Sequence, residues 1–204
     1  MQSTTPAAMR SAVQPTATRL LTAWRAAKPI RKRQAALACL VTVGIAAAAT
    51  TTVPTASAIV IGIVGLLAGA IAIVDLHERR IPNHLLTLAL ITVVVGALLG
   101  TLFTSDRTAG AVLVGLIVAA FPLLAIRYGN GLAMGDVKMA GVLGAAGGLI
   151  HPVVGLITVF VAALSSGIFA LIHNRKRLAL GPWLWAGFGT ACAIGIVFVR
   201  IRGH

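Results

Sequence analysis

Seven apolar runs, separated by short polar segments, occupy most of the chain after its first 34 residues. Six of them carry no charged side chain and have the length that a helix needs to cross about 30 Å of hydrocarbon. They cover residues 35–53, 55–74, 84–103, 108–126, 152–172 and 182–199. The seventh, Val137–Ile150, is shorter and contains Lys138. We therefore predict an all-α, polytopic bundle of membrane helices, in which protein or water surrounds the charged end of the short run.

The scarcity of charge excludes several other classes of protein. Only 10 % of the 204 residues are charged, whereas a soluble domain carries about 25 %, and hydrophobic residues make up 58 %. This composition excludes an ordinary soluble enzyme, a disordered chain and a disulfide-stapled secreted domain. At this length we expect one domain. Because the acidic residues are Asp75, Glu78, Asp106 and Asp136, any carboxylate chemistry must come from these four.

The basic residues set the predicted orientation in the membrane. With the N-terminus in the cytoplasm and all seven runs crossing, fourteen of the 17 basic residues lie on the cytoplasmic side, as the positive-inside rule expects. Seven of the fourteen lie in residues 1–34, a basic tail that is either an amphipathic helix on the inner leaflet or disordered. We expect anionic membrane lipid to balance this charge. Nucleic acid is not expected as a partner, because basic and aromatic residues are not interleaved as they are in proteins that stack on bases.

Residues 35–54 form a separate predicted element, an additional span at the N-terminal side of the bundle. A signal peptide is the alternative interpretation, with the apolar run as its core and cleavage after the small residues Ala56, Ser57 and Ala58. Against cleavage, the polar region before this run is long, and another span follows at once. Either interpretation leaves the orientation of the later spans unchanged.

Other catalytic chemistries lack a matching pattern in the sequence. The two cysteines lie far apart in separate apolar runs, which provides neither a zinc knuckle nor a redox pair. His77 and Glu78 begin like a zinc-protease helix motif, but Ile81 stands where the second histidine is required. Ser165 and Ser166 lie within a span, and no predicted span has a histidine in its interior to activate them. We therefore predict no metal site and no serine nucleophile.

Two of the four acids, Asp75 and Asp136, are predicted at the same membrane depth. Asp75 ends one span and Asp136 opens the short run, and both fall at the cytoplasmic boundary of the expected topology. Each has a structural explanation, since Asp75 can pair with Arg79 one helical turn later and Asp136 can cap its helix. We favour a functional explanation, because ionisable groups at membrane depth are costly and usually serve function.

Two converging carboxylates can divide acid and base work between them. Like charges a few ångströms apart do not both ionise, so the pair shares one proton and activates water. Asp136 begins a helix and lies near Lys138, which favours its charged form, whereas Asp75 ends a helix. From the sequence we therefore expect Asp136 to act as the base and Asp75 as the initial acid.

Three short motifs around these residues resemble the type IV prepilin peptidases. Residues 75–83, from Asp75 to Ile-Pro-Asn at the end, resemble the first signature of that family. Residues 133–139 are similar to its Gly-x-Gly-Asp motif, with Ala133 in place of the first glycine. Residues 180–183, Leu-Gly-Pro-Trp, are similar to the Gly-Pro that opens the family's last helix. The resemblance covers about residues 57–199.

The resemblance implies a membrane aspartyl endopeptidase that removes the short basic leader of type IV prepilins or pseudopilins at the cytoplasmic face, after a glycine. Asp75 and Asp136 would be its catalytic pair, and Gly135 would let the backbone pack closely beside the scissile segment. Further residues would bind substrate or support the motifs: Lys138, Pro82, Asn83, Gly181 and Pro182. Six helices within residues 55–204 would form the protease core. No metal or organic cofactor is implied.

The chain also departs from the long members of that family. Those members carry an N-terminal methyltransferase region with paired Cys-x-x-Cys motifs, which this sequence lacks, so it resembles the short form and N-methylation is not expected. Two other interpretations stay open. One is a membrane transporter or channel component whose aspartates relay protons, and the other is an inactive relative that assists pilus or secretion assembly. The oligomeric state is not predicted.

Overall fold

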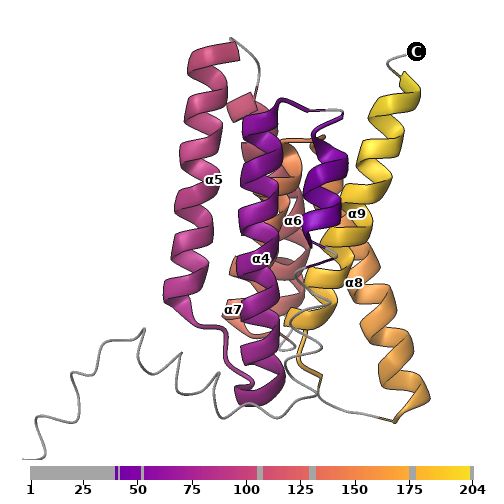
Figure 1. Ribbon diagram of the computed structural model, residues 1–204. Helices are drawn as coiled ribbons and strands as arrows, with labels where there is room; N and C mark the ends of the chain where they lie inside the picture. The colour runs from indigo at the N-terminus through magenta and orange to yellow at the C-terminus, as the bar shows by residue number, and fades with distance from the viewer. Residues whose placement is uncertain are drawn as a thin grey trace, which may run out of the picture. The chain divides into compact units, whose positions relative to one another are not determined.

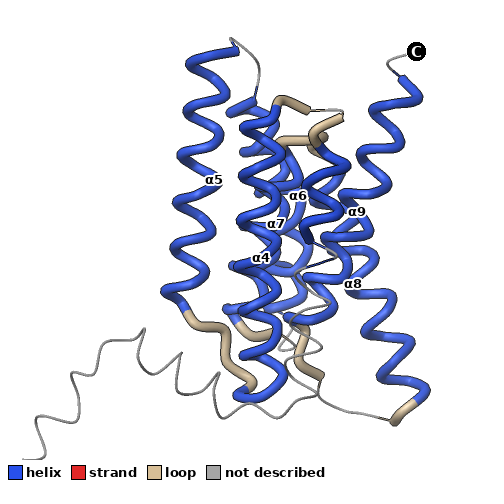
Figure 2. Tube along the Cα trace, viewed as in Figure 1, coloured by secondary structure: helices blue, strands red, loops and turns tan. Residues whose placement is uncertain are grey.

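The computed structural model describes residue 40 and residues 42–51, 53–104, 108–128, 132–174 and 178–202. These residues form six long helices and a short helical segment at residues 42–49, and none of them forms a strand (Figures 1 and 2). The long helices are α4 (Thr55–Glu78), α5 (Asn83–Thr104), α6 (Thr108–Tyr128), α7 (Met134–Gly148), α8 (Val153–Ile172) and α9 (Gly181–Arg202). The predicted all-α class is confirmed.

Five of these helices are long and apolar enough to cross a membrane, namely α4, α5, α6, α8 and α9. They correspond to five of the six charge-free runs, which confirms the predicted polytopic membrane bundle. The sixth run, 35–53, lies partly outside the described residues, and the part inside them is helical over residues 42–49. The basic tail, residues 1–34, lies outside the described residues altogether.

The short run forms α7, which occupies the centre of the bundle. α7 contacts each of the other five long helices, and every residue from Met139 to Leu149 is buried. Glycines make this close packing feasible: a Cβ on Gly144 would overlap the carbonyl oxygen of Gly115 on α6. A Cβ on Gly155 of α8 would lie 2.7 Å from that same oxygen. Small residues therefore bring three helices together at one point and enclose α7 in protein.

Successive helices alternate in direction. Figure 1 shows α4, α6 and α8 finishing at the lower end of the bundle, where α5, α7 and α9 begin. We call this the site end, because it brings together the end of α4, the start of α7 and the start of α9. These are the three places where the sequence motifs lie.

The helical segment at residues 42–49 packs against small residues of the bundle. A Cβ on Gly62 of α4 would lie 2.9 Å from a side chain of this segment, and a Cβ on Gly65 would lie 2.5 Å from another. Ser57 and Ala58, which the signal-peptide interpretation places at the cleavage site, are buried in the first turn of α4. A peptidase that cut there would have to unwind this turn first.

Candidate active site

Asp75 lies in the last turn of α4, with its side chain only 5 % exposed. Its Oδ2 accepts a hydrogen bond of 3.0 Å from the backbone N–H of Gly181, the first residue of α9. The helix ends with Arg79 in the left-handed region (φ 51°), where the Arg79 N–H donates to the backbone oxygen of Asp75 at 2.9 Å. Among the described residues Asp75 forms no ion pair with Arg79. That structural explanation for Asp75 is therefore wrong.

Asp136 lies in the first turn of α7 and is half-buried. Its carboxylate accepts no hydrogen bond from any residue that the structure describes, and the N-cap position of α7 belongs to Ala133. The alternative role of Asp136 as a helix cap is therefore wrong as well. Instead, Asp136 is close enough to Asp75 for the two charges to act on one another. The fold brings the two aspartates together from helices that are far apart in the sequence.

The segment around Gly135 packs against the first motif. A Cβ on Gly135 would lie 3.1 Å from the Cβ of Ile81, so the missing side chain lets α7 approach the connection between α4 and α5. The residue that Gly135 meets here belongs to the protein itself, and a role beside substrate stays a prediction. Ala133, which stands where the family motif has its first glycine, is exposed and has φ −75° and ψ 144°. Any residue adopts this extended conformation, so an alanine there is not strained.

The third motif reaches the same site from α9. A Cβ on Gly181 would lie 2.7 Å from Oδ2 of Asp75, so only glycine permits the observed contact without displacing the carboxylate. Pro182 follows as the second helical residue, where its fixed φ suits a helix and its missing N–H is not needed. The structure thus places Gly181 directly beside Asp75.

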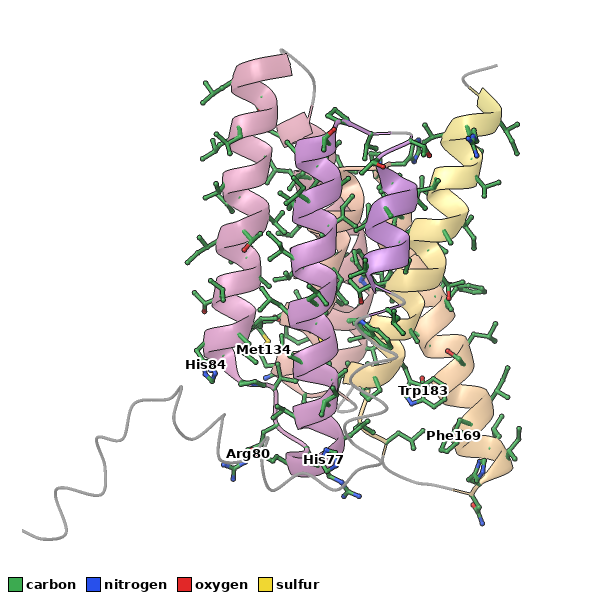
Figure 3. All side chains as sticks on the ribbon, in the orientation of Figure 1. His77, Arg80, His84, Met134, Phe169 and Trp183 are labelled. Carbon is green, nitrogen blue, oxygen red and sulfur yellow. The ribbon has the colours of Figure 1, made fainter. Side chains whose placement is uncertain are left out.

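An aromatic cluster that the sequence analysis missed packs α9 onto α8 at the site end. The rings of Trp183 and Phe169 lie 5.2 Å apart between centroids, and Phe169 also stacks on His173 at 4.1 Å. Figure 3 shows Trp183 and Phe169 side by side near the lower end of the two helices. The available signal was the spacing of Phe169 and His173, which are one helical turn apart. The cluster helps to fix where the first turn of α9, and hence Gly181, lies.

Other predicted site residues lie along a groove rather than at the carboxylate pair. Lys138 and Asn83 line a groove of about 450 Å³ between α5, α6 and α7, together with Met134 and mostly apolar residues. Because Lys138 follows Asp136 by two positions on a helix, the two side chains point to different faces of α7. Pro82 is half-buried in the connection before α5, and its carbonyl accepts the N–H of Leu86 at 3.3 Å.

The surroundings of the pair at the site end are basic and exposed. Figure 3 shows His77, Arg80 and His84 at this end, and all three side chains are exposed. In the described part of the chain, no group of three or more His, Cys, Asp or Glu residues gathers to hold a metal ion. The chemistry available from the described side chains is that of two neighbouring carboxyl groups, an arrangement that can share a proton and activate water.

Comparison with known proteins identifies the family. A model of the type IV leader peptidase family matches residues 60–172, more than half of the chain, including both aspartates. The match ends before α9, so the motif at Gly181 lies outside it. No curated protein and no solved structure matches the chain significantly. With its polytopic helical bundle and this match, the chain belongs to the type IV leader peptidase family.

Proposed function

We propose that the protein is a membrane-embedded aspartyl endopeptidase that cleaves the short basic leader of type IV prepilin or pseudopilin-like proteins at the cytoplasmic face of the cell membrane. The family match supports a peptidase in general. The observation that carries the aspartyl mechanism is the meeting of Asp75 and Asp136 at one end of the bundle. Neither aspartate has the structural role that the sequence suggested for it, since Asp75 forms no ion pair with Arg79 and Asp136 does not cap α7.

The reaction needs one proton shared between the two carboxyl groups. The ionised carboxylate takes a proton from water while the water oxygen attacks the scissile carbonyl carbon, and the protonated partner donates its proton to the carbonyl oxygen. The resulting gem-diol collapses when the first group returns its proton to the amide nitrogen. The C–N bond then breaks, and the second group recovers a proton from the diol. The pair ends in its starting state.

The charge at the two ends of the bundle supports cleavage on the cytoplasmic side. The site end carries Arg79, Arg80, Arg127 and Lys138, all of them exposed, whereas Arg200 is near the opposite end of α9. An excess of basic residues marks the cytoplasmic side of membrane proteins. The same residues, together with the basic tail, would attract anionic membrane lipid.

Co-expression with a candidate prepilin tests this function. We expect the wild-type protein to shorten the prepilin on a gel, and Asp75→Asn and Asp136→Asn each to abolish the shortening. Glu78→Gln is the matched control, because Glu78 is an exposed acid of the same helix end and should retain full processing. Immunoblots confirm that all variants reach the membrane at equal levels.

Normal processing by either aspartate variant would refute the aspartyl mechanism. A different result would favour the rival interpretation as a transporter. In that case no prepilin is cut, and vesicles lose proton flux in Asp136→Asn but not in Glu78→Gln.

A further inference from the structure

The hydrogen bond from the Gly181 N–H reaches only one of the two aspartates, Asp75. Gly181 is the first residue of α9, and the N–H groups of the first helical turn have no partner within their own helix. One of these free donors points at Oδ2 of Asp75 at 3.0 Å. The positive end of the α9 dipole lies there too. Both effects stabilise a carboxylate more than they stabilise a neutral acid.

The Gly181-Pro182 motif at the start of α9 supplies a single hydrogen-bond donor close to Asp75. Glycine allows the approach, since a Cβ would lie 2.7 Å from Oδ2 and 3.2 Å from the Cβ of Asp75. Pro182 has no N–H, so Gly181 is the only donor among the first two residues of α9. The pair Gly-Pro thus presents one N–H, in helical geometry, to one carboxylate oxygen.

Asp136 lacks a comparable donor. It lies at the N-terminus of α7 and shares the favourable end of that dipole, but no described N–H or side chain donates to its carboxylate. A directed hydrogen bond to a charged group is stronger than the diffuse effect of a helix end. When the two carboxyl groups share one proton, the negative charge is therefore more stable on Asp75 than on Asp136.

Other charges do not overturn this difference. Among the remaining titratable side chains whose burial is described on the elements that pack against Asp75, the thiol of Cys192 on α9 is buried, and the others are exposed: His77 and Glu78 on α4, Arg79 and Arg80 in the connection to α5, His84 on α5, Lys138 on α7 and Arg200 on α9. Exposed groups are screened by water and ions. The charge that acts on Asp136 is that of Asp75 itself.

We propose that the Gly181 N–H at the start of α9 holds Asp75 as the ionised member of the pair, so that Asp136 carries the shared proton. This inference rests on the proposed function for its catalytic meaning. Asp75 then takes the proton from water, and Asp136 donates to the scissile carbonyl. These roles are the reverse of those expected from the ends of α4 and α7 alone. Gly181 is a positioning residue, because it acts through Asp75.

Carbodiimide labelling measures the protonation of each aspartate without needing substrate. Dicyclohexylcarbodiimide modifies protonated carboxyl groups, so the modification of each residue falls as the pH rises through its titration. The full-length protein is labelled in lipid nanodiscs across a pH series, and peptide mass spectrometry quantifies the adducts at Asp75 and Asp136. We expect the labelling of Asp75 to disappear at a clearly lower pH than that of Asp136. The midpoint of each curve is compared rather than its amplitude, because the two residues differ in exposure.

Gly181→Ala tests the role of the N–H, since the added Cβ displaces the carboxylate from its donor. We expect the Asp75 midpoint to rise by about one pH unit, as loss of a charge-assisted hydrogen bond requires. The acidic limb of the pH–rate profile for leader cleavage should move upward with it. Gly187→Ala is the matched control in the same helix, where a Cβ would lie 2.6 Å from the carbonyl oxygen of Thr158. It should lower stability without moving either midpoint.

The outcomes separate this inference from the proposed function. Equal midpoints in the wild type, or a higher midpoint for Asp75, would overturn the inference even if Gly181→Ala fails to accumulate. A folded Gly181→Ala with unchanged midpoints would overturn it too. If the midpoints follow the expected order but no prepilin is cut, the proposed function fails and the protonation assignment stands.

Discussion

Two neighbouring helices of the bundle, α5 and α7, differ in length, in composition and in how much of their surface is buried. α5 has 22 residues, is apolar enough to span a membrane, and buries only a narrow stripe that includes Leu86, Val93 and Ala97. α7 has 15 residues and carries Asp136 in its first turn, yet it is buried from Met139 onward. A helix that faces lipid needs large apolar side chains, whereas a helix enclosed by protein needs small ones that let its neighbours approach. Hydropathy therefore identifies α5 easily as a membrane span, but it gives the least information about α7, the helix at the centre of the bundle.

The largest expected effect is that of Gly144→Ala on α7. The new Cβ would overlap the Cβ of Ala119 and the carbonyl oxygen of Gly115, and backbone atoms have little room to move. We expect the free energy of unfolding to fall by about 3 kcal/mol, at the upper end for overpacking. Unfolding by SDS in mixed micelles measures the loss. Gly141→Ala is the control on the same helix, because its Cβ would meet Ala120 at an ordinary 3.5 Å. Equal stability of the two variants would contradict the packing of α7.

A second comparison removes the same side chain from each helix. Leu143 on α7 is 1 % exposed and Leu98 on α5 is 56 % exposed. Leu143→Ala leaves a cavity among packed helices and should cost about 2 kcal/mol, the lower end for such a change, because burial against another helix in lipid carries no hydrophobic driving force. Leu98→Ala changes a surface that faces lipid and should cost no more than about 0.5 kcal/mol. Unfolding by SDS in mixed micelles measures the loss of unfolding free energy in both variants. A loss for Leu98→Ala near that for Leu143→Ala would mean that α5 has a protein neighbour on its outer face.

The smallest expected effect is that of Gly96→Ala on α5. Its Cβ would lie 2.5 Å from Cγ2 of Val60, a side chain of α4. Because α5 is packed on one side only, it can move outward, and we expect a loss of about 1 kcal/mol. Gly167→Ala on α8, where nothing lies within 4 Å, serves as the control and should be neutral. If Gly96→Ala is as damaging as Gly144→Ala, the contrast between the two helices is wrong.

Much of the fold is predictable from the sequence, because a helix that crosses lipid needs about 20 consecutive apolar residues. The charge-free runs predict α4, α5, α6, α8 and α9, and the count of acids leads directly to Asp75 and Asp136. The contacts between helices are not predictable in the same way. Glycine contacts such as that of Gly144 with Gly115 leave no periodic pattern, because glycine is frequent throughout the chain from Gly44 onward.

The contacts within the candidate active site are likewise not predictable from the sequence. Resemblance to a family motif draws attention to Gly181, but nothing in the spacing reveals that its N–H reaches Asp75 across 106 positions of sequence. The expected roles of the two acids depended on the ends of their own helices. The neighbour that distinguishes the acids comes from a third helix. Likewise the aromatic contact of Trp183 with Phe169 depends on how α9 lies against α8.

The contact of Gly181 with Asp75 has a consequence for the way the protein is made. Synthesis proceeds from the N-terminus, and α4 and α7 enter the membrane before α9 exists. Until α9 joins the other helices, Asp75 lacks its donor, and the two acids lie in an incomplete bundle. A nascent chain is therefore expected to stay inactive until α9 has been translated. A product truncated before α9 would carry both aspartates and still lack an ordered pair.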